Sequence, residues 1–135
     1  MPALRYRALA HTADVRLLVW GDDERALLAN AVAGTLSIVL GRRPGGAAKR
    51  WSSVAPWPQK PAHRVVATVN EALYQLYLRR ALVVELRMRG KRAWLGLADL
   101  PPRCRPRVEI KAATFHALTV ERWRGRLRAV LTLDL

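Results

Sequence analysis

Two segments with helical hydrophobic periodicity constrain the fold of this 135-residue chain more than any other feature. They cover residues 24–40 and 62–80, and each places an apolar residue at every third or fourth position. Asp22 and Asp23 precede the first segment as N-cap residues, and Gly41 follows it as a stop signal. The pattern predicts two helices, and it favours capping over metal binding for these acids.

Segments that alternate or are rich in β-branched residues surround the two helices and predict strands. They are Val15–Trp20, Val83–Arg89, Ala93–Leu97, Val108–Ala112, Phe115–Trp123 and Leu127–Leu135. A turn at Gly90 and Lys91 makes the second and third a hairpin. In the last strand the odd-numbered positions are apolar, so Asp134 should point away from the apolar face. This order predicts an α+β fold with two helices packed on a mostly antiparallel sheet.

Residues 41–62 are rich in Gly, Pro and Arg and form an internal break in what we predict to be a single domain over residues 1–135. A short edge strand is expected at Trp51–Ala55. Lys49, Arg50 and Trp51 together would suit phosphate contacts and base stacking with single-stranded RNA. A solvated loop that packs its tryptophans on the body of the protein is the favoured alternative.

The chain carries 24 Lys and Arg against 10 Asp and Glu, a net charge of +14. Such a charge attracts nucleic acid, and compositional drift explains it equally well. Cys104 is the only cysteine, which excludes an internal disulfide. No apolar run is long enough to cross a membrane and no signal core is present, so we expect a cytoplasmic protein without a membrane partner.

Asp14 and Asp134 lie near opposite ends of this acid-poor chain and are a candidate metal-binding pair. Calcium, magnesium and manganese prefer oxygen ligands, which Asp side chains and main-chain carbonyls supply. From residue type alone, a turn cap at Asp14 and a salt bridge from Asp134 to an arginine are favoured over a metal site.

Four short motifs, spread in order over nearly the whole chain, resemble the archease family. They are His11-Thr12-Ala13-Asp14-Val15, Asn70-Glu71-Ala72-Leu73-Tyr74, the stretch from Glu109 to His116, and Leu133-Asp134-Leu135. The resemblance implies a sandwich of strand-helix-strand-strand modules, one inserted in the other. It also implies an accessory protein rather than an enzyme.

In function, the resemblance implies an activator of an RtcB-type RNA-splicing ligase that promotes its guanylylation and repeated turnover. It further implies that Asp14 and Asp134, with help from Leu135, hold a divalent ion such as calcium, magnesium or manganese. Two rival functions stay open. One is a chaperone-like partner of a tRNA 5-methylcytosine methyltransferase, and the other is a stand-alone basic RNA-binding module.

Several acids of the family pattern are replaced here, by Arg7, Ala10 and Ala67. Each replacement makes the surroundings of the aspartate pair less negative, so we expect weak metal binding by the isolated chain and further ligands from the ligase. Lys111 and His116 are candidate contacts to the ligase or its nucleotide. A buried, hydrogen-bonded role for His116 is an equal alternative.

Overall fold

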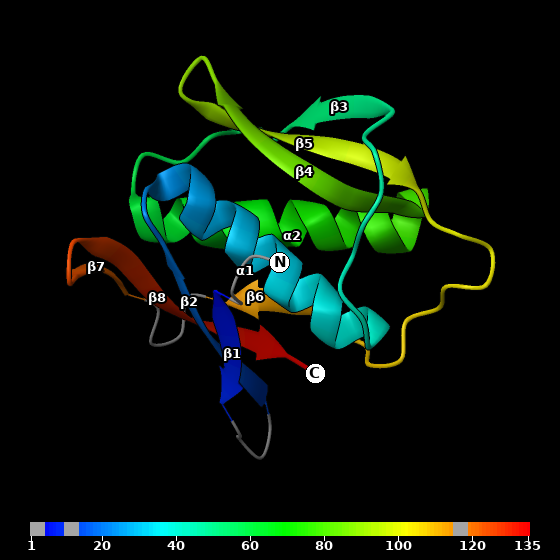
Figure 1. Cartoon of the computed structure of the whole chain (residues 1–135), viewed down its shortest axis with the longest axis horizontal. Coiled ribbons are helices and arrows are strands. Elements are labelled where there is room, and N and C mark those ends of the chain that lie inside the picture. Colours follow the sequence, from blue (N-terminus) through cyan, green and yellow to red (C-terminus); the bar gives the residue numbers. More distant parts are fainter. Residues whose placement is uncertain (1–4, 10–13, 115–118) are drawn as a thin grey trace.

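The computed structural model describes residues 5–9, 14–114 and 119–135, which form two antiparallel sheets and two helices (Figure 1). The five-stranded sheet has the order β1-β2-β8-β6, and β7 also pairs with β8. Its strands are β1 (Tyr6–Leu9), β2 (Asp14–Gly21), β6 (Ala112–Thr114), β7 (Val120–Trp123) and β8 (Arg126–Asp134). The three-stranded sheet has the order β3-β5-β4, with β3 (Arg50–Ser53), β4 (Ala81–Arg89) and β5 (Arg92–Asp99).

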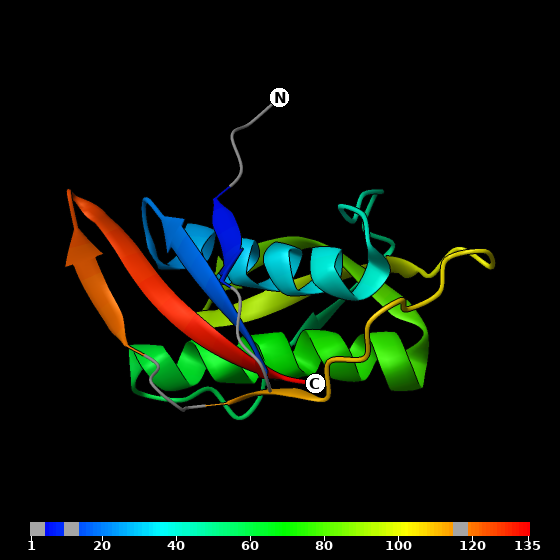
Figure 2. The same ribbon diagram turned by 90° about the horizontal axis from the view of Figure 1, so that it is seen from below.

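The helices α1 (Glu24–Leu40) and α2 (Pro61–Arg79) lie between the two sheets (Figures 1 and 2). Helix α1 contacts β2 and β8 of one sheet and β4 of the other. A helix with apolar residues around most of its circumference is stable only when it is covered on several sides. The two sheets cover α1 from two sides, as the sandwich implied by the family resemblance requires.

The ends of α1 follow the predicted signals. The Asp23 carboxylate accepts a hydrogen bond from the Ala26 N–H at 2.8 Å. Gly41 ends the helix in the left-handed conformation, with φ of 69°. The N-terminal boundary of α1 is therefore fixed by a capping aspartate, and the capping role predicted for Asp23 is confirmed.

The chain order shows one module nested inside another. The elements β3, α2, β4 and β5 form a strand-helix-strand-strand unit that contains the whole three-stranded sheet. This unit is inserted between α1 and β6, so the outer unit of β2, α1, β7 and β8 is completed only after it. The α+β class and the nested modules are confirmed.

One strand prediction needs correction. The strand expected at Val108–Ala112 is irregular up to Lys111, because the Arg107 and Val108 N–H groups both donate to the Val39 carbonyl, at 2.7 and 3.2 Å. Of the strand expected at Phe115–Trp123, only β7 falls within the described residues. The edge strand β1 was not predicted. Neither helix of the described chain combines the length and apolar character of a membrane span.

Candidate metal-binding site at the end of β2 and β8

The register of β2 and β8 places Asp14 directly opposite Asp134. Residues that face each other in an antiparallel pair project from the same side of the sheet, with Cβ atoms typically about 4.5–5.5 Å apart. Asp134 is exposed and Asp14 is half-buried. Two carboxylates from opposite ends of the sequence thus share one edge of the five-stranded sheet.

The alternation of burial along both strands shows which face carries the pair. Leu17 and Val19 of β2 and Leu131 and Leu133 of β8 are fully buried toward the helices. Asp134 has the opposite parity and is exposed. The prediction that Asp134 points away from the apolar face is confirmed.

A third strand, β6, extends this edge of the sheet. Ala112 pairs with Asp134, and the Lys111 N–H donates to the Asp134 carbonyl at 2.8 Å. Lys111 itself is exposed. The Asp134 carbonyl is therefore tied to the segment before β6, while the Asp134 side chain stays exposed.

Helix α2 holds β6 in place through two polar side chains. The Asn70 amide donates to the Ala113 carbonyl at 3.2 Å and accepts from the Ala113 N–H at 2.7 Å. The Tyr77 hydroxyl donates to the Ile110 carbonyl at 3.0 Å and accepts from the Ile110 N–H at 3.1 Å. Burial raises the pKa of Tyr77, and the hydrogen bond with Ile110 opposes this in part. Asn70 and Tyr77 are positioning residues for the strand beside Asp134.

The residues at this edge fit part of a hard-cation site. Two aspartates and nearby main-chain oxygens are the donors that calcium, magnesium and manganese prefer. Within the described residues no group of three or more His, Cys, Asp or Glu side chains completes the set. Asp14 and Asp134 alone would therefore leave part of the coordination of such an ion to other ligands.

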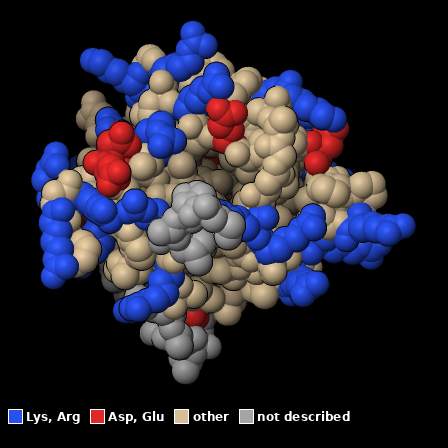
Figure 3. All heavy atoms as spheres, viewed as in Figure 1, with Lys and Arg blue, Asp and Glu red and all other residues tan. Residues whose placement is uncertain are grey.

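The electrostatic setting opposes tight binding of a cation. Arg16 lies two positions from Asp14 on the same face of β2, opposite Thr132. Lys and Arg side chains spread over the face of the molecule shown in Figure 3, where acids form only separate spots. A divalent ion at the aspartate pair is repelled by this charge.

The other predicted contact residues are divided between the two sheets. Leu135 follows Asp134 and is exposed, whereas His116 lies outside the described residues. Lys49, Arg50 and Trp51 lie at β3, on the far side of the helices from the aspartate pair (Figure 1).

The basic residues at β3 are engaged in ion pairs. The Lys49 ammonium and the Arg50 guanidinium lie 3.4 and 3.1 Å from the Asp99 carboxylate. The hydrogen bond from Arg50 is the largest cause that lowers the pKa of the Asp99 carboxyl group. The hydrogen bond from Lys49 lowers this pKa further. Lys49 and Arg50 thus belong to a different surface from Asp14 and Asp134.

Neither Arg16 nor Tyr77 was predicted from the sequence to belong to this site. The signal for Arg16 was available, because Asp14 and Arg16 share the same parity along a predicted strand. Tyr77 lacked a signal, since its partner Ile110 is 33 positions away in the sequence.

Comparison with known proteins identifies the family. The model of the archease protein family matches residues 6–135. The chain belongs to the archease family. Comparison with curated protein sequences finds no match.

Two solved structures of archease-like proteins share the fold. One is the crystal structure of an archease from Thermotoga maritima, described as a possible chaperone, with a TM-score of 0.69 and 20% identity over 96% of each chain. The other is the solution structure of protein 1598 from Methanobacterium thermoautotrophicum, with a TM-score of 0.67 and 16% identity, covering 98% of this chain and 100% of that one. The resemblance drawn from the four motifs is confirmed, and so is the archease fold.

Proposed function

We propose that this archease is a non-catalytic activator of an RtcB-type RNA ligase and that it acts through the edge of the five-stranded sheet that carries Asp14 and Asp134. The observation that carries the proposal is the β2–β8 register, which sets these two residues opposite each other. They are the same two residues that the family resemblance implies as metal ligands.

A surface role suits this edge better than chemistry within a closed site. Asp134, Leu135 and Lys111 are all exposed there, so a partner protein can reach them directly. An enzyme site would normally need a concave pocket that excludes water. Asp14 and Asp134 do not line the hollows at Trp94, Pro44 and Cys104.

A divalent ion would suit this surface as a shared ligand. When bound, it would supply positive charge for the oxygen ligands or phosphate groups of the ligase. Asp14 and Asp134 would hold it from one side, and the ligase would complete its coordination. This division of ligands accounts for the incomplete donor set in the archease alone.

The alternative function is that of a chaperone-like partner of a tRNA methyltransferase. The Thermotoga relative, described as a possible chaperone, supports this class in general terms. A chaperone would raise the yield or stability of the methyltransferase and would leave ligase guanylylation unchanged. An assay of ligase guanylylation and an assay of methyltransferase yield or stability therefore distinguish the two functions.

The ligase assay tests the proposal directly. Purified ligase is incubated with GTP and manganese, with and without the archease, and formation of the guanylylated ligase is followed over time. We expect faster guanylylation and more than one round of RNA joining per ligase when the archease is present. An unchanged rate at every archease concentration would refute the proposal.

A further inference from the structure

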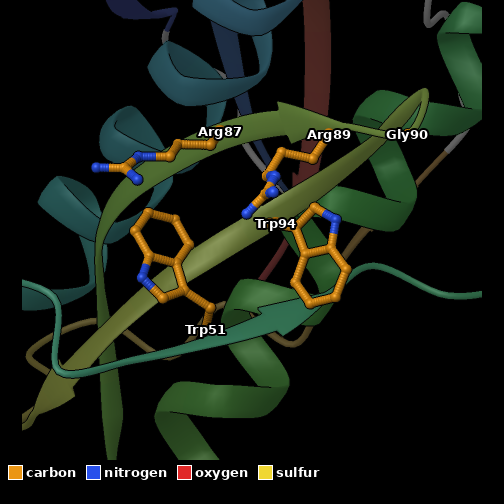
Figure 4. Close-up of a pocket in the computed structure, with 5 residues that line it drawn as sticks. All are labelled: Trp51, Arg87, Arg89, Gly90 and Trp94. Atoms are coloured by element: carbon orange, nitrogen blue, oxygen red, sulfur yellow. The ribbon is translucent and has the colours of Figure 1, made fainter.

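The outer face of the three-stranded sheet carries a hollow that lies away from the aspartate pair. The hollow has a volume of about 400 Å³ (Figure 4). It is lined by Trp51, Arg87, Arg89, Gly90 and Trp94. On the opposite face of this sheet Leu86 and Leu95 are buried in the core, so the hollow lies on the side that the helices do not cover.

The two indoles come from adjacent strands, β3 and β5, and the Trp51 indole is held by its neighbours. Trp51 pairs with Gly96, and a Cβ atom at Gly96 would lie only 3.0 Å from Trp51 Cη2. The glycine therefore lets the Trp51 ring lie across β5. The Arg87 guanidinium stacks over this ring, 4.6 Å from its centroid. The position of the Trp51 indole is thus set before any ligand binds, with Arg87 over one face of the ring.

The charges around the hollow are only partly balanced. Arg87 pairs with Glu85, with 3.0 Å between Nε and Oε1. Arg89 is exposed and forms no ion pair with a described residue. Figure 4 shows its side chain extending toward the space between the two indoles. The hollow therefore combines aromatic faces with a cation that is available to an anion.

We propose that this hollow binds an unpaired nucleotide of a single-stranded nucleic acid. The base would stack on an indole, and the phosphate would contact Arg89. Every base has a face that stacks on an aromatic ring, and arginine meets phosphate with a planar fork of donors. An acidic peptide would satisfy the arginine and leave the indoles without a flat partner. The proposal is independent of ligase activation, because it concerns the other sheet.

Binding of a short fluorescein-labelled oligouridylate to the purified archease, followed by fluorescence anisotropy, tests the proposal. We expect Trp51→Ala and Trp94→Ala each to weaken binding about tenfold, the range for loss of one base stack. Trp123→Ala is the matched control. Trp123 is 38% exposed, against 37% for Trp51, and lies under Arg124 and Arg128, but it is in β7. This control should bind as the unchanged protein does.

Salt dependence separates stacking from phosphate contact. Arg89→Gln should reduce the slope of log affinity against log salt by about 0.7, the value for one phosphate contact with a single strand. Trp51→Ala should leave the slope unchanged, because it removes no charge. Ribo- and deoxyribo-oligonucleotides of the same sequence both carry the proposed nucleotide. The oligonucleotide that binds more tightly identifies whether RNA or DNA is the source of this ligand.

Two results would overturn the proposal. One is equal weakening by Trp51→Ala and Trp123→Ala, and the other is competition by polyglutamate as strong as that by oligouridylate at the same ionic strength. Either would reduce the hollow to a general polyanion contact. If Trp51→Ala unfolds, as judged by circular dichroism, Trp51→Leu keeps apolar contact with Gly96 and removes the stacking face. Full binding by a folded Trp51→Leu protein would contradict the proposal as well.

Discussion

Asp14 and Asp134 face each other across β2 and β8, yet they differ in exposure. Like charges directly opposite in a sheet are destabilising, so the pair is unfavourable for folding alone. A bound cation would replace this repulsion between the two carboxylates with attraction of both to the ion. The cation that we propose for this pair would therefore add to the stability of the folded protein.

At this scale, metal binding is measurable without any partner. Manganese should raise the midpoint of thermal unfolding, with about 2.7 kcal/mol of stabilisation at a hundred times its Kd. Asp134→Asn should abolish that increase. Asp99→Asn is the control, because it removes an exposed acid from the other sheet. An equal manganese effect in both variants would place the ion elsewhere.

We expect the positive charge of Arg16 to weaken cation binding at the aspartate pair. Electrostatic repulsion between an arginine and a divalent ion one side-chain spacing away costs on the order of 1 kcal/mol of binding free energy, even in a water-like dielectric. We therefore expect Arg16→Gln to bind manganese about fivefold more tightly in calorimetry, with Arg122→Gln in β7 as the control. Unchanged or weaker binding by a folded Arg16→Gln protein would show that its charge does not limit the site.

Among the elements, helix α2 determines where β6 lies. Tyr77→Phe removes both hydrogen bonds with Ile110 and should lower the free energy of unfolding by about 1–2 kcal/mol in urea denaturation. Tyr74→Phe is the control, because Tyr74 is an exposed tyrosine of the same helix. Equal effects of the two substitutions would contradict this role.

The pH dependence of the Tyr77 contribution has a definite sign. Its pKa is raised in the folded protein above the ordinary 10.0, so the protonated hydroxyl is favoured by folding. The stability difference between the unchanged protein and Tyr77→Phe should be full below pH 10 and shrink as pH rises above it. A difference that grows with alkaline pH would mean that the phenolate is the stabilised form.

The elements that the sequence predicted well are those with long periodic patterns. The boundaries of α1 were predicted to the residue, because Asp23 and Gly41 mark both ends. The strand β1 has only four residues and no clear alternation, and it exists through pairing with β2. The segment at 108–111 resembles a strand locally, but Val39 and Tyr77 take up its hydrogen bonds. Tertiary contacts of this kind leave no local trace in a sequence.

More of the aspartate pair than of the Trp51 hollow could be predicted from the sequence. Asp14 and Asp134 were named through the motifs, but their pairing is known only from the register. Trp51 was named from composition, whereas Arg87, Arg89 and Trp94 were not. The available signal was the predicted hairpin, because Arg87 and Arg89 alternate along one strand and Trp94 pairs with Arg87 across the turn. What the sequence lacked was the placement of β3 beside β5.

In the molecule as a whole, the helices separate the two faces for which we propose functions. The aspartate pair lies on one sheet and the Trp51 hollow on the other (Figure 1). Substitutions at distant sites with no shared partner usually act independently. Asp134→Asn should therefore leave oligouridylate binding unchanged, and Trp51→Leu should leave guanylylation without RNA unchanged. A loss in either cross-assay would show that the two faces are coupled.

The central claim is that the aspartate pair activates a ligase, and one measurement tests it most directly. Guanylylation of the ligase is followed with the unchanged archease, with Asp14→Asn, with Asp134→Asn and with the double variant, after circular dichroism has verified that each is folded. We expect acceleration only by the unchanged protein, with both single variants as inactive as the double. Acceleration by a folded double variant to the same extent as by the unchanged protein would contradict the account.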